Sequence, residues 1–158
     1  MVERTGIVGL TGAFKENVTD LKAGSKVVFA GSVAVCAPFA ELLAYAVREN
    51  GFELIYMPRA DPRQARRMLW SEGVGFGVSE QRADPRGADL LVILGGLAMP
   101  RFGCSLQDIE LAIEALSSAK RPKLIGVCFQ SIFQRAGWTE RLPFDVLIDA
   151  TLAVEVRS

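Results

Sequence analysis

The sequence predicts a three-layer α/β/α protein with a mostly parallel, five-stranded sheet of flavodoxin-like or Rossmann-like type and an extra N-terminal helix. Short apolar runs rich in Val, Ile and Leu alternate with segments of helical periodicity, which is the pattern of a parallel sheet covered by helices on both faces. Glycines mark many of the boundaries between these segments. The 158 residues suit one folded unit, so we predict a single α/β domain over residues 1–158.

The first predicted element is an amphipathic helix, because apolar residues recur at three- and four-residue spacing from Ile7 to Leu21 and Gly24 follows. A second helix begins near Pro38, a residue that the first helical turn tolerates, and closes at Gly51. Five apolar runs are the predicted strands. They are Lys26 to Gly31, Phe52 to Pro58, Asp89 to Gly95, Lys123 to Cys128 and Phe144 to Asp149, and an alternating tail from Leu152 to Val156 follows the last one.

The remaining elements rest on capping signals. A carboxylate at Asp61, followed by proline and then by Gln64, predicts a helix that runs to about Glu72. Residues 73–87 are rich in glycine and charge and are expected to be mostly loop, with one short edge strand near residues 74–78. Ser105 with Asp108 opens a further helix, and a capping box of residues 131 and 134 opens a short one.

The predicted strand order indicates where a ligand would bind. If residues 74–78 formed an inner strand, only residues 79–88 would connect it to the next, which is short for a parallel crossover. We therefore predict the five-stranded order 2-1-3-4-5 rather than the six-stranded dinucleotide-binding order. In either case the strand order reverses between the first strand and the third, so a ligand is expected between the loops after Gly31 and after Gly95.

Composition excludes several kinds of partner. Lys plus Arg and Asp plus Glu both number 18, so the net charge of zero gives no electrostatic case for nucleic acid or an anionic membrane. The start of the chain does not read as a signal peptide, and the longest apolar run, Ser32 to Val47, is interrupted by Glu41 and too short to cross a bilayer. Three cysteines without regular spacing do not form a disulfide framework, so we expect a cytoplasmic protein.

The chain has no histidine. Ser-His-Asp and Cys-His catalysis and histidine-bearing zinc sites are therefore excluded within it. An acid or base would have to be an Asp, Glu, Cys, Lys or Tyr whose pKa is shifted toward neutrality.

All three cysteines fall at or just beyond the ends of predicted strands, at the sheet edge where ligands bind in this architecture. Each one alone is explained simply as a small buried apolar residue, and their common location is what favours function. No close-spaced pair such as C-x-x-C occurs, so no metal site is predicted. The expected ligand-binding residues are Gly31, Ser32, Cys36, Gly95, Gly96, Leu97, Cys104 and Ser131.

The ligand itself is left open. The loop GSVAVCAP contains neither the G-x-G-x-x-G fingerprint nor a P-loop, so a dinucleotide or ATP is disfavoured and the cofactor is unknown. Glu41, Tyr45 and Arg48 form a narrow polar stripe on the second helix. That stripe is either an exposed or subunit-facing edge, or it brings Glu41 to the cleft as a catalytic base.

The segment KLIGVCFQSIFQRAG places Cys128 at a turn from strand to helix, where the helix N-terminus favours a thiolate. Together with LLVILGG upstream, residues 88–137 resemble the class I glutamine amidotransferase and DJ-1/PfpI superfamily. That resemblance implies a nucleophile at Cys128 and an oxyanion site at Gly95 and Gly96, with Glu41 as an imperfect counterpart of an early carboxylate. Phe129 and the lack of histidine depart from the superfamily's pattern, so the resemblance supports the fold more than the activity.

A broader resemblance spans nearly the whole chain. The segments VCAPFAELLAYAV, LVILGGLAMP, GVCFQSIFQRAGW and FDVLIDATL resemble a conserved, uncharacterised family of archaeal proteins found chiefly in methanogens. Three hypotheses of function stand together. The first is binding of a small anionic metabolite or cofactor by residues 31–38, 95–104 and 128–131. The second is a hydrolase or transferase that depends on Cys128. The third is a non-enzymatic subunit that forms a homo-oligomer through the Ala-rich helix bearing Glu41 and Tyr45.

Overall fold

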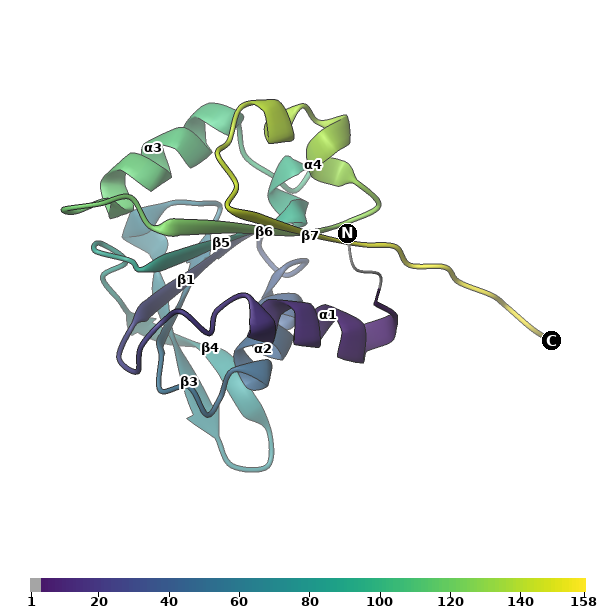
Figure 1. Ribbon diagram of the computed structural model, residues 1–158, viewed down its shortest axis with the longest axis horizontal. Helices are drawn as coiled ribbons and strands as arrows, with labels where there is room; N and C mark the ends of the chain where they lie inside the picture. Colours follow the sequence, from purple (N-terminus) through teal and green to yellow (C-terminus); the bar gives the residue numbers. More distant parts are fainter. Residues whose placement is uncertain (1–3) are drawn as a thin grey trace.

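The computed structural model describes residues 4–158, and its seven strands form one sheet with helices on both faces (Figure 1). The strands are β1 Lys26–Gly31, β2 Glu53–Pro58, β3 Arg66–Ser71, β4 Gly75–Arg82, β5 Leu90–Leu94, β6 Lys123–Phe129 and β7 Val146–Ala150. Their order across the sheet is β4-β3-β2-β1-β5-β6-β7. The α/β class is therefore as predicted, but the sheet has seven strands rather than five.

The five parallel strands confirm the predicted order 2-1-3-4-5. β1 lies at the centre, where Val27 is opposite Leu54 of β2 on one side and Leu90 of β5 on the other. β5, β6 and β7 continue the parallel pairing outward. The carboxyl ends of these five strands therefore lie along one edge of the sheet, as the sequence predicted.

The predicted helix from Asp61 to about Glu72 is wrong. The Asp61 carboxylate accepts a hydrogen bond from the Arg63 backbone N–H, but it caps only a single 3₁₀ turn, Pro62–Gln64. Ala65 is already extended, with ψ of 136°, and β3 follows. A cap starts a helix only where an apolar repeat of about 3.6 residues follows, and in β3 Met68 alone is buried.

The predicted loop over residues 73–87 is also largely wrong, because β4 occupies residues 75–82 as an edge strand longer than the expected one. β3 and β4 pair antiparallel, with Met68 opposite Val78. Gly73 and Gly75 take φ of +78° and +101° in the connecting turn, a region that residues with a Cβ rarely adopt. The hairpin therefore needs glycine at both positions, and it extends the sheet by two strands.

In the described part of the chain, α-helices cover both faces of the sheet (Figure 1). α1 Gly6–Glu16 and α2 Ala37–Ala46 lie on one face, and α3 Leu106–Leu116 and α4 Ile132–Arg135 lie on the other. α1 ends earlier than predicted, although Val18 is still fully buried beyond its end. α3 begins with the predicted capping box, in which Ser105 and Asp108 satisfy each other's backbone N–H groups.

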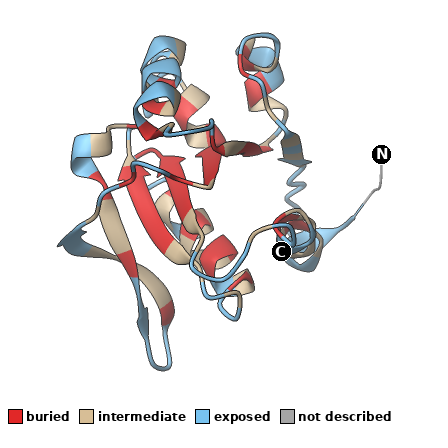
Figure 2. Ribbon diagram, turned by 60° about the vertical axis from the view of Figure 1, so that its left-hand side comes forward, coloured by how far each residue is buried: buried red, intermediate tan, exposed pale blue. Residues whose placement is uncertain are grey.

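Alternate strand residues supply two hydrophobic cores, because successive side chains of a strand point to opposite faces. Phe29 of β1 belongs to the core beneath α1 and α2, where its ring packs against Phe14. Val28 belongs to the core beneath α3 and α4, together with Ile109 and Phe133. Figure 2 shows buried strands at the centre of the molecule. Among residues 4–158, no helix combines the length and the apolar character that crossing a bilayer requires.

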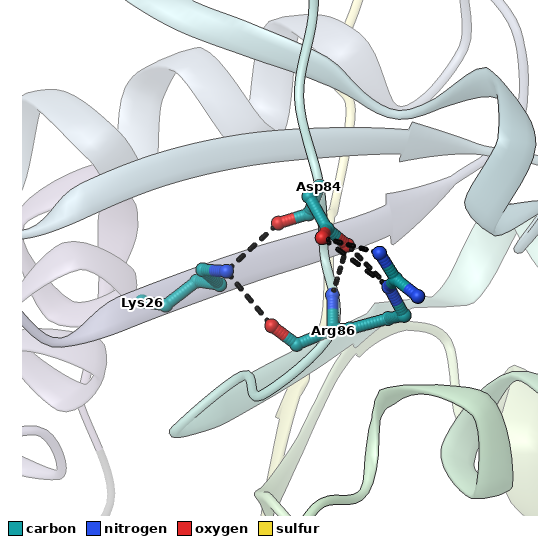
Figure 3. Close-up of polar contacts among 3 residues, drawn as sticks. All are labelled: Lys26, Asp84 and Arg86. Carbon is teal, nitrogen blue, oxygen red and sulfur yellow. Dashed lines mark hydrogen bonds and ion pairs between the residues drawn. The ribbon is translucent and has the colours of Figure 1, made fainter.

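Lys26 holds the segment that returns the chain from the edge hairpin to the centre of the sheet (Figure 3). Its Nζ donates hydrogen bonds to the backbone oxygens of Asp84, at 2.9 Å, and Arg86, at 2.8 Å. The Arg86 guanidinium in turn lies 2.9 Å from the Asp84 carboxylate and holds the pKa of that carboxyl below its usual range. The ammonium group thus satisfies two carbonyls of a loop that has no strand partner.

Replacing Lys26 by Met is expected to lower the free energy of unfolding by about 1 kcal/mol, because the loop carbonyls of Asp84 and Arg86 lose their shared donor. Urea unfolding followed by circular dichroism measures the change. Lys22→Met is the matched control, since Lys22 is exposed and its ammonium group makes no hydrogen bond within residues 4–158, where only its backbone carbonyl accepts one, from the Ser25 N–H. Equal free energies of unfolding for the two variants would show that the hydrogen bonds of Lys26 to the Asp84 and Arg86 carbonyls do not stabilise the loop.

Candidate functional site

The site begins where β1 and β5, neighbours in the sheet, send the chain to opposite faces. After Gly31 the chain leads to α2, and after Leu94 it enters a 3₁₀ turn, Gly95–Ala98, and then α3 on the other face. This is the point at which the strand order reverses, and ligands of such sheets bind outside it. The two loops that the sequence singled out therefore do meet here.

A buried polar cluster fills the space directly between those loops. Ser32 is fully buried, and its Oγ lies 3.2 Å from the Cys36 Sγ. The Tyr56 hydroxyl donates a hydrogen bond of 2.6 Å to the Ser32 backbone oxygen. Burial raises the pKa of Tyr56, so this hydroxyl stays protonated and remains a donor.

Because of this cluster, there is no room for a Cβ atom at Gly31 or Gly96. A Cβ on Gly31 would lie 2.5 Å from the Cys36 Cβ and 2.6 Å from the Tyr56 Oη. A Cβ on Gly96 would lie 2.4 Å from the Cys36 Sγ and 2.8 Å from the Ser32 Oγ. Both glycines therefore accommodate the protein's own side chains, which occupy the crevice between the two loops.

The open space lies beside this cluster, toward the ends of β5 and β6. A cavity of about 250 Å³ is lined in part by Cys36, Gly95 and Gly96. Its lining is almost entirely apolar. The apolar walls are Val35, Phe39, Leu94, Met99, Val127, Phe129 and Ile132, and the rings of Phe39 and Phe129 are 4.9 Å apart.

Two polar side chains reach this cavity, Gln130 and Arg135. The Arg135 Nε donates to the Gln130 backbone oxygen at 3.0 Å, and no carboxylate of residues 4–158 forms an ion pair with its guanidinium. The Gln130 Oε1 accepts from the Leu152 N–H at 2.6 Å. The side-chain amide is thereby oriented, and its NH₂ group makes no hydrogen bond to the described part of the chain.

The predicted ligand-binding residues divide into two groups. Cys36, Gly95 and Gly96 line the cavity, whereas Gly31 and Ser32 pack behind Cys36. The others lie outside the lining: Leu97 is fully buried and its carbonyl accepts from the Cys104 N–H, and Ser131 bonds to Asp149. Phe129 and Gln130 lie within the predicted binding range 128–131, although neither was singled out. Phe39 and Arg135 lie outside all the predicted ranges, and Phe39 follows the first of them directly.

The predicted capping box at Ser131 is wrong. Gln130 and Ser131 both take φ of +56°, and Ser131 makes no cap hydrogen bond to the helix that follows. Its Oγ instead donates to Asp149 Oδ2 at 2.8 Å, and its N–H donates to Asp149 Oδ1 at 3.0 Å. Two consecutive left-handed residues turn the chain off β6, and the four-residue helix α4 follows them.

Cys128 lies inside β6, opposite Asp149, and its side chain belongs to the core on the α3 face. Burial is the main cause that raises the pKa of the thiol to about 12, although the backbone N–H groups of Ile132 and Phe133 act in the opposite direction. The Sγ lies 3.5 Å from Asp149 Oδ1. The group is therefore a protonated thiol at neutral pH, and the left-handed turn comes two residues after it.

The three cysteines are free and lie on both sides of the sheet. Cys36 belongs to the core beneath α1 and α2, whereas Cys104 and Cys128 contact the core beneath α3. Burial raises the pKa of Cys104 to about 11. Over residues 4–158, no group of three His, Cys, Asp or Glu side chains comes together to hold a metal ion.

Glu41 is half-buried on α2 and does not line the cavity. The rest of its stripe faces the chain's own hairpin. The Tyr45 ring stacks on Trp70 with centroids 6.1 Å apart, and the Arg48 guanidinium lies 4.1 Å over the Tyr45 ring. The helix face predicted as a subunit contact is thus partly occupied by β3.

Fold and site together define a doubly wound α/β protein with a small apolar cavity at the carboxyl edge of its parallel strands. Over residues 5–153 the chain matches the family described as "Uncharacterized protein conserved in archaea (DUF2124)", and it belongs to that family. It is 39% identical over 151 residues to an uncharacterized protein of Methanothermobacter thermautotrophicus, covering 95% of this chain and 92% of that protein. It is 37% identical to one of Methanocaldococcus jannaschii, covering 98% and 91%.

A solved structure has the same fold. The crystal structure of a protein of unknown function from Methanothermobacter thermautotrophicus superposes with a TM-score of 0.89 at 35% identity. The match covers 100% of this chain and 96% of that one. The predicted membership of an archaeal family with methanogen relatives is confirmed.

Gly96→Ala is expected to lower the free energy of unfolding by about 1–3 kcal/mol, because the new methyl group overlaps the Cys36 Sγ and the Ser32 Oγ. Adding Cys36→Ala removes the closest of these atoms, so the double variant should lose less stability than the sum of the two single variants. Urea unfolding measures the cycle. Gly77→Ala is the control, since no atom lies within 4 Å of a Cβ there. Strict additivity would contradict the packing described.

Native protein at neutral pH is expected to react with iodoacetamide far more slowly than a free thiol at Cys128 and Cys104, because burial keeps both as protonated thiols. Mass spectrometry of timed digests gives the rate at each cysteine, and protein unfolded in urea should become alkylated at all three. Alkylation of native Cys128 at or above the rate of a free thiol would contradict this and restore it as a nucleophile.

Proposed function

We propose that the protein binds a small molecule with an apolar body and one anionic group, a carboxylate or phosphate, in the cavity between the ends of β5 and β6. The observation that carries this proposal is an apolar cavity of about 250 Å³ that meets one arginine without a carboxylate partner within residues 4–158. Binding sites are commonly apolar hollows with a few polar groups that fix orientation.

The apolar walls set the class of ligand body. Val35, Phe39, Leu94, Val127 and Phe129 offer hydrocarbon surface and no hydrogen-bonding side chain. A sugar or a nucleotide ribose would lose hydrogen bonds to water without replacement there. A short acyl chain or another compact apolar group instead gains from leaving water.

Arg135 and Gln130 set the charge of the ligand. The Arg135 Nε donates a hydrogen bond to the Gln130 backbone carbonyl, which orients the guanidinium and leaves its two terminal nitrogens available. Two parallel N–H donors match the two oxygens of a carboxylate or phosphate. The oriented Gln130 amide adds a further donor beside them.

Binding is favoured over hydrolysis by Cys128. That thiol lies on the other face of the sheet from most of the cavity walls, and its pKa is raised rather than lowered. A nucleophilic cysteine needs thiolate character at neutral pH, which this environment opposes. We also infer a reducing cytoplasm as the place of action, because all three cysteines are free.

Isothermal titration with hexanoate and with hexyl phosphate tests the proposal. Native protein should bind at least one of them, and Arg135→Gln should weaken that binding about tenfold or more, because a charge-assisted bidentate pair is lost. Hexanol, which has no charge, should bind native protein and Arg135→Gln equally.

Arg141→Gln is the matched control, because Arg141 is exposed and lies 3.4 Å from Glu110 rather than at the cavity. Its affinity for hexanoate should equal that of native protein. Absence of binding by both anions at millimolar concentration, or equal affinities of native protein and Arg135→Gln, would overturn the proposal.

A further inference from the structure

The last eight residues leave the body of the protein as an extended segment (Figure 1, yellow). We call residues 151–158 the C-terminal arm. All of them are exposed, and Leu152, Val154 and Val156 have exposed fractions of 57%, 78% and 94%. Burying three large apolar side chains in one short arm against a partner surface is favourable, and clustered exposed apolar residues commonly mark such contacts.

The apolar pattern of the arm continues that of β7 without a break. Every second residue from Val146 to Val156 is apolar, which is the period of a strand with one buried face. Val146, Ile148 and Ala150 pack against the core beneath α1 and α2. The arm therefore has the sequence of the second half of a strand whose first half is already in place.

β7 is an edge of the sheet, and its outer side is open within the described residues. The Ala150 carbonyl accepts from Gln130 on the β6 side, so the backbone groups of Leu147 and Asp149 point away from β6. Residues 146–156 contain no lysine and no proline, the residues that commonly blunt an edge. The opposite edge, β4, ends in charged and exposed residues including Glu80 and Arg82.

We propose that β7 and the arm pair antiparallel with the same segment of a second copy of this chain, about a twofold axis through Thr151. In this register the apolar residues meet on the face that α1 covers. Val146 lies opposite the partner's Val156, Ile148 opposite the partner's Val154, and Ala150 opposite the partner's Leu152. Each arm thus supplies the missing neighbours of the other copy's β7, and the interface is self-complementary, as a twofold contact must be.

Charged residues favour this register over the two registers whose axes lie one residue away. Moving the axis to Ala150 sets Asp145 opposite the partner's Glu155, and moving it to Leu152 sets Asp149 opposite that same residue. Like charges directly across a strand pair destabilise it. With the axis at Thr151, Arg157 instead lies opposite the partner's Asp145, a pair of opposite charges.

α1 offers further apolar surface on the same face of the sheet. Ile7 and Val8 near its start are 57% and 83% exposed, and α1 contacts β7. The partner's arm adds its valines and leucine to the sheet face that α1 covers. The proposal does not depend on the ligand cavity.

Light scattering after size exclusion tests the assembly on the full chain. Native protein is expected at twice the 17.1 kDa of one chain. Ala153→Pro should give the mass of one chain, because it removes an N–H that the pairing directs at the partner's Asp149 carbonyl. Ala153 is exposed in the arm, so its replacement leaves the fold intact. Ala153→Ser keeps that N–H and should remain a dimer.

Disulfide trapping tests the register. Thr151 lies on the axis, so Thr151→Cys brings two thiols within the Cα separation of about 4.4–6.8 Å that a disulfide needs. Oxidised glutathione should convert this variant, and not the exposed loop control Ser118→Cys, to a covalent dimer on a non-reducing gel.

A native protein of single-chain mass at high concentration would overturn the proposal. So would a dimer that persists in Ala153→Pro while Thr151→Cys fails to cross-link, since that result assigns the contact to another surface.

Discussion

The tight packing of two side chains against two glycines, at the point where the strand order reverses, decides where this sheet edge is open. Gly31 and Gly96 meet around the side chains of Ser32 and Cys36, with no room for a Cβ at either glycine. A doubly wound sheet ordinarily leaves a crevice at this point for its ligand. Here the protein fills the crevice itself, and the open space moves one strand along, to the ends of β5 and β6. The usual crevice offers a ligand backbone N–H donors, whereas this cavity offers apolar side chains and the Arg135 guanidinium.

Strand positions and the order of the parallel strands were predictable, because buried strands such as residues 89–95 are short, continuous runs rich in Leu, Ile and Val that are bounded by turn residues. The hairpin was not, because Asp61 and Pro62 imitate a helix start while the following residues lack a clear period. Ser131 was misjudged for a different reason. A capping box is read from residue types, but two left-handed residues at 130 and 131 aim the Ser131 hydroxyl at Asp149, which lies on a neighbouring strand. Such a partner is set by the fold and not by local sequence.

At the candidate site, the position of each residue along the chain was predictable, but its surroundings in the fold were not. Sequence placed Cys36, Cys104 and Cys128 at the correct edge, but it could not tell on which face of the sheet each thiol would lie or how deeply it would be buried. Burial decides their chemistry, since it outweighs the helix N–H groups at Cys128 and raises that pKa. Phe39 and Phe129 were not singled out as cavity walls, because phenylalanine is by type a core-forming residue. Gln130, one of the two left-handed residues after β6, lines the cavity together with those rings, and local sequence does not reveal that turn.

The central claim is that this edge cavity, and no other surface, receives the ligand. Backbone amide spectra of ¹⁵N-labelled protein during a hexanoate titration test it most directly, because they report position as well as affinity. The account predicts saturable shifts at Gly95, Gly96 and Gln130, with Lys120 and Arg121 at the far, polar end of the sheet unchanged. Shifts confined to that polar end, or a cavity whose amides stay fixed while hexanoate binds, would contradict it.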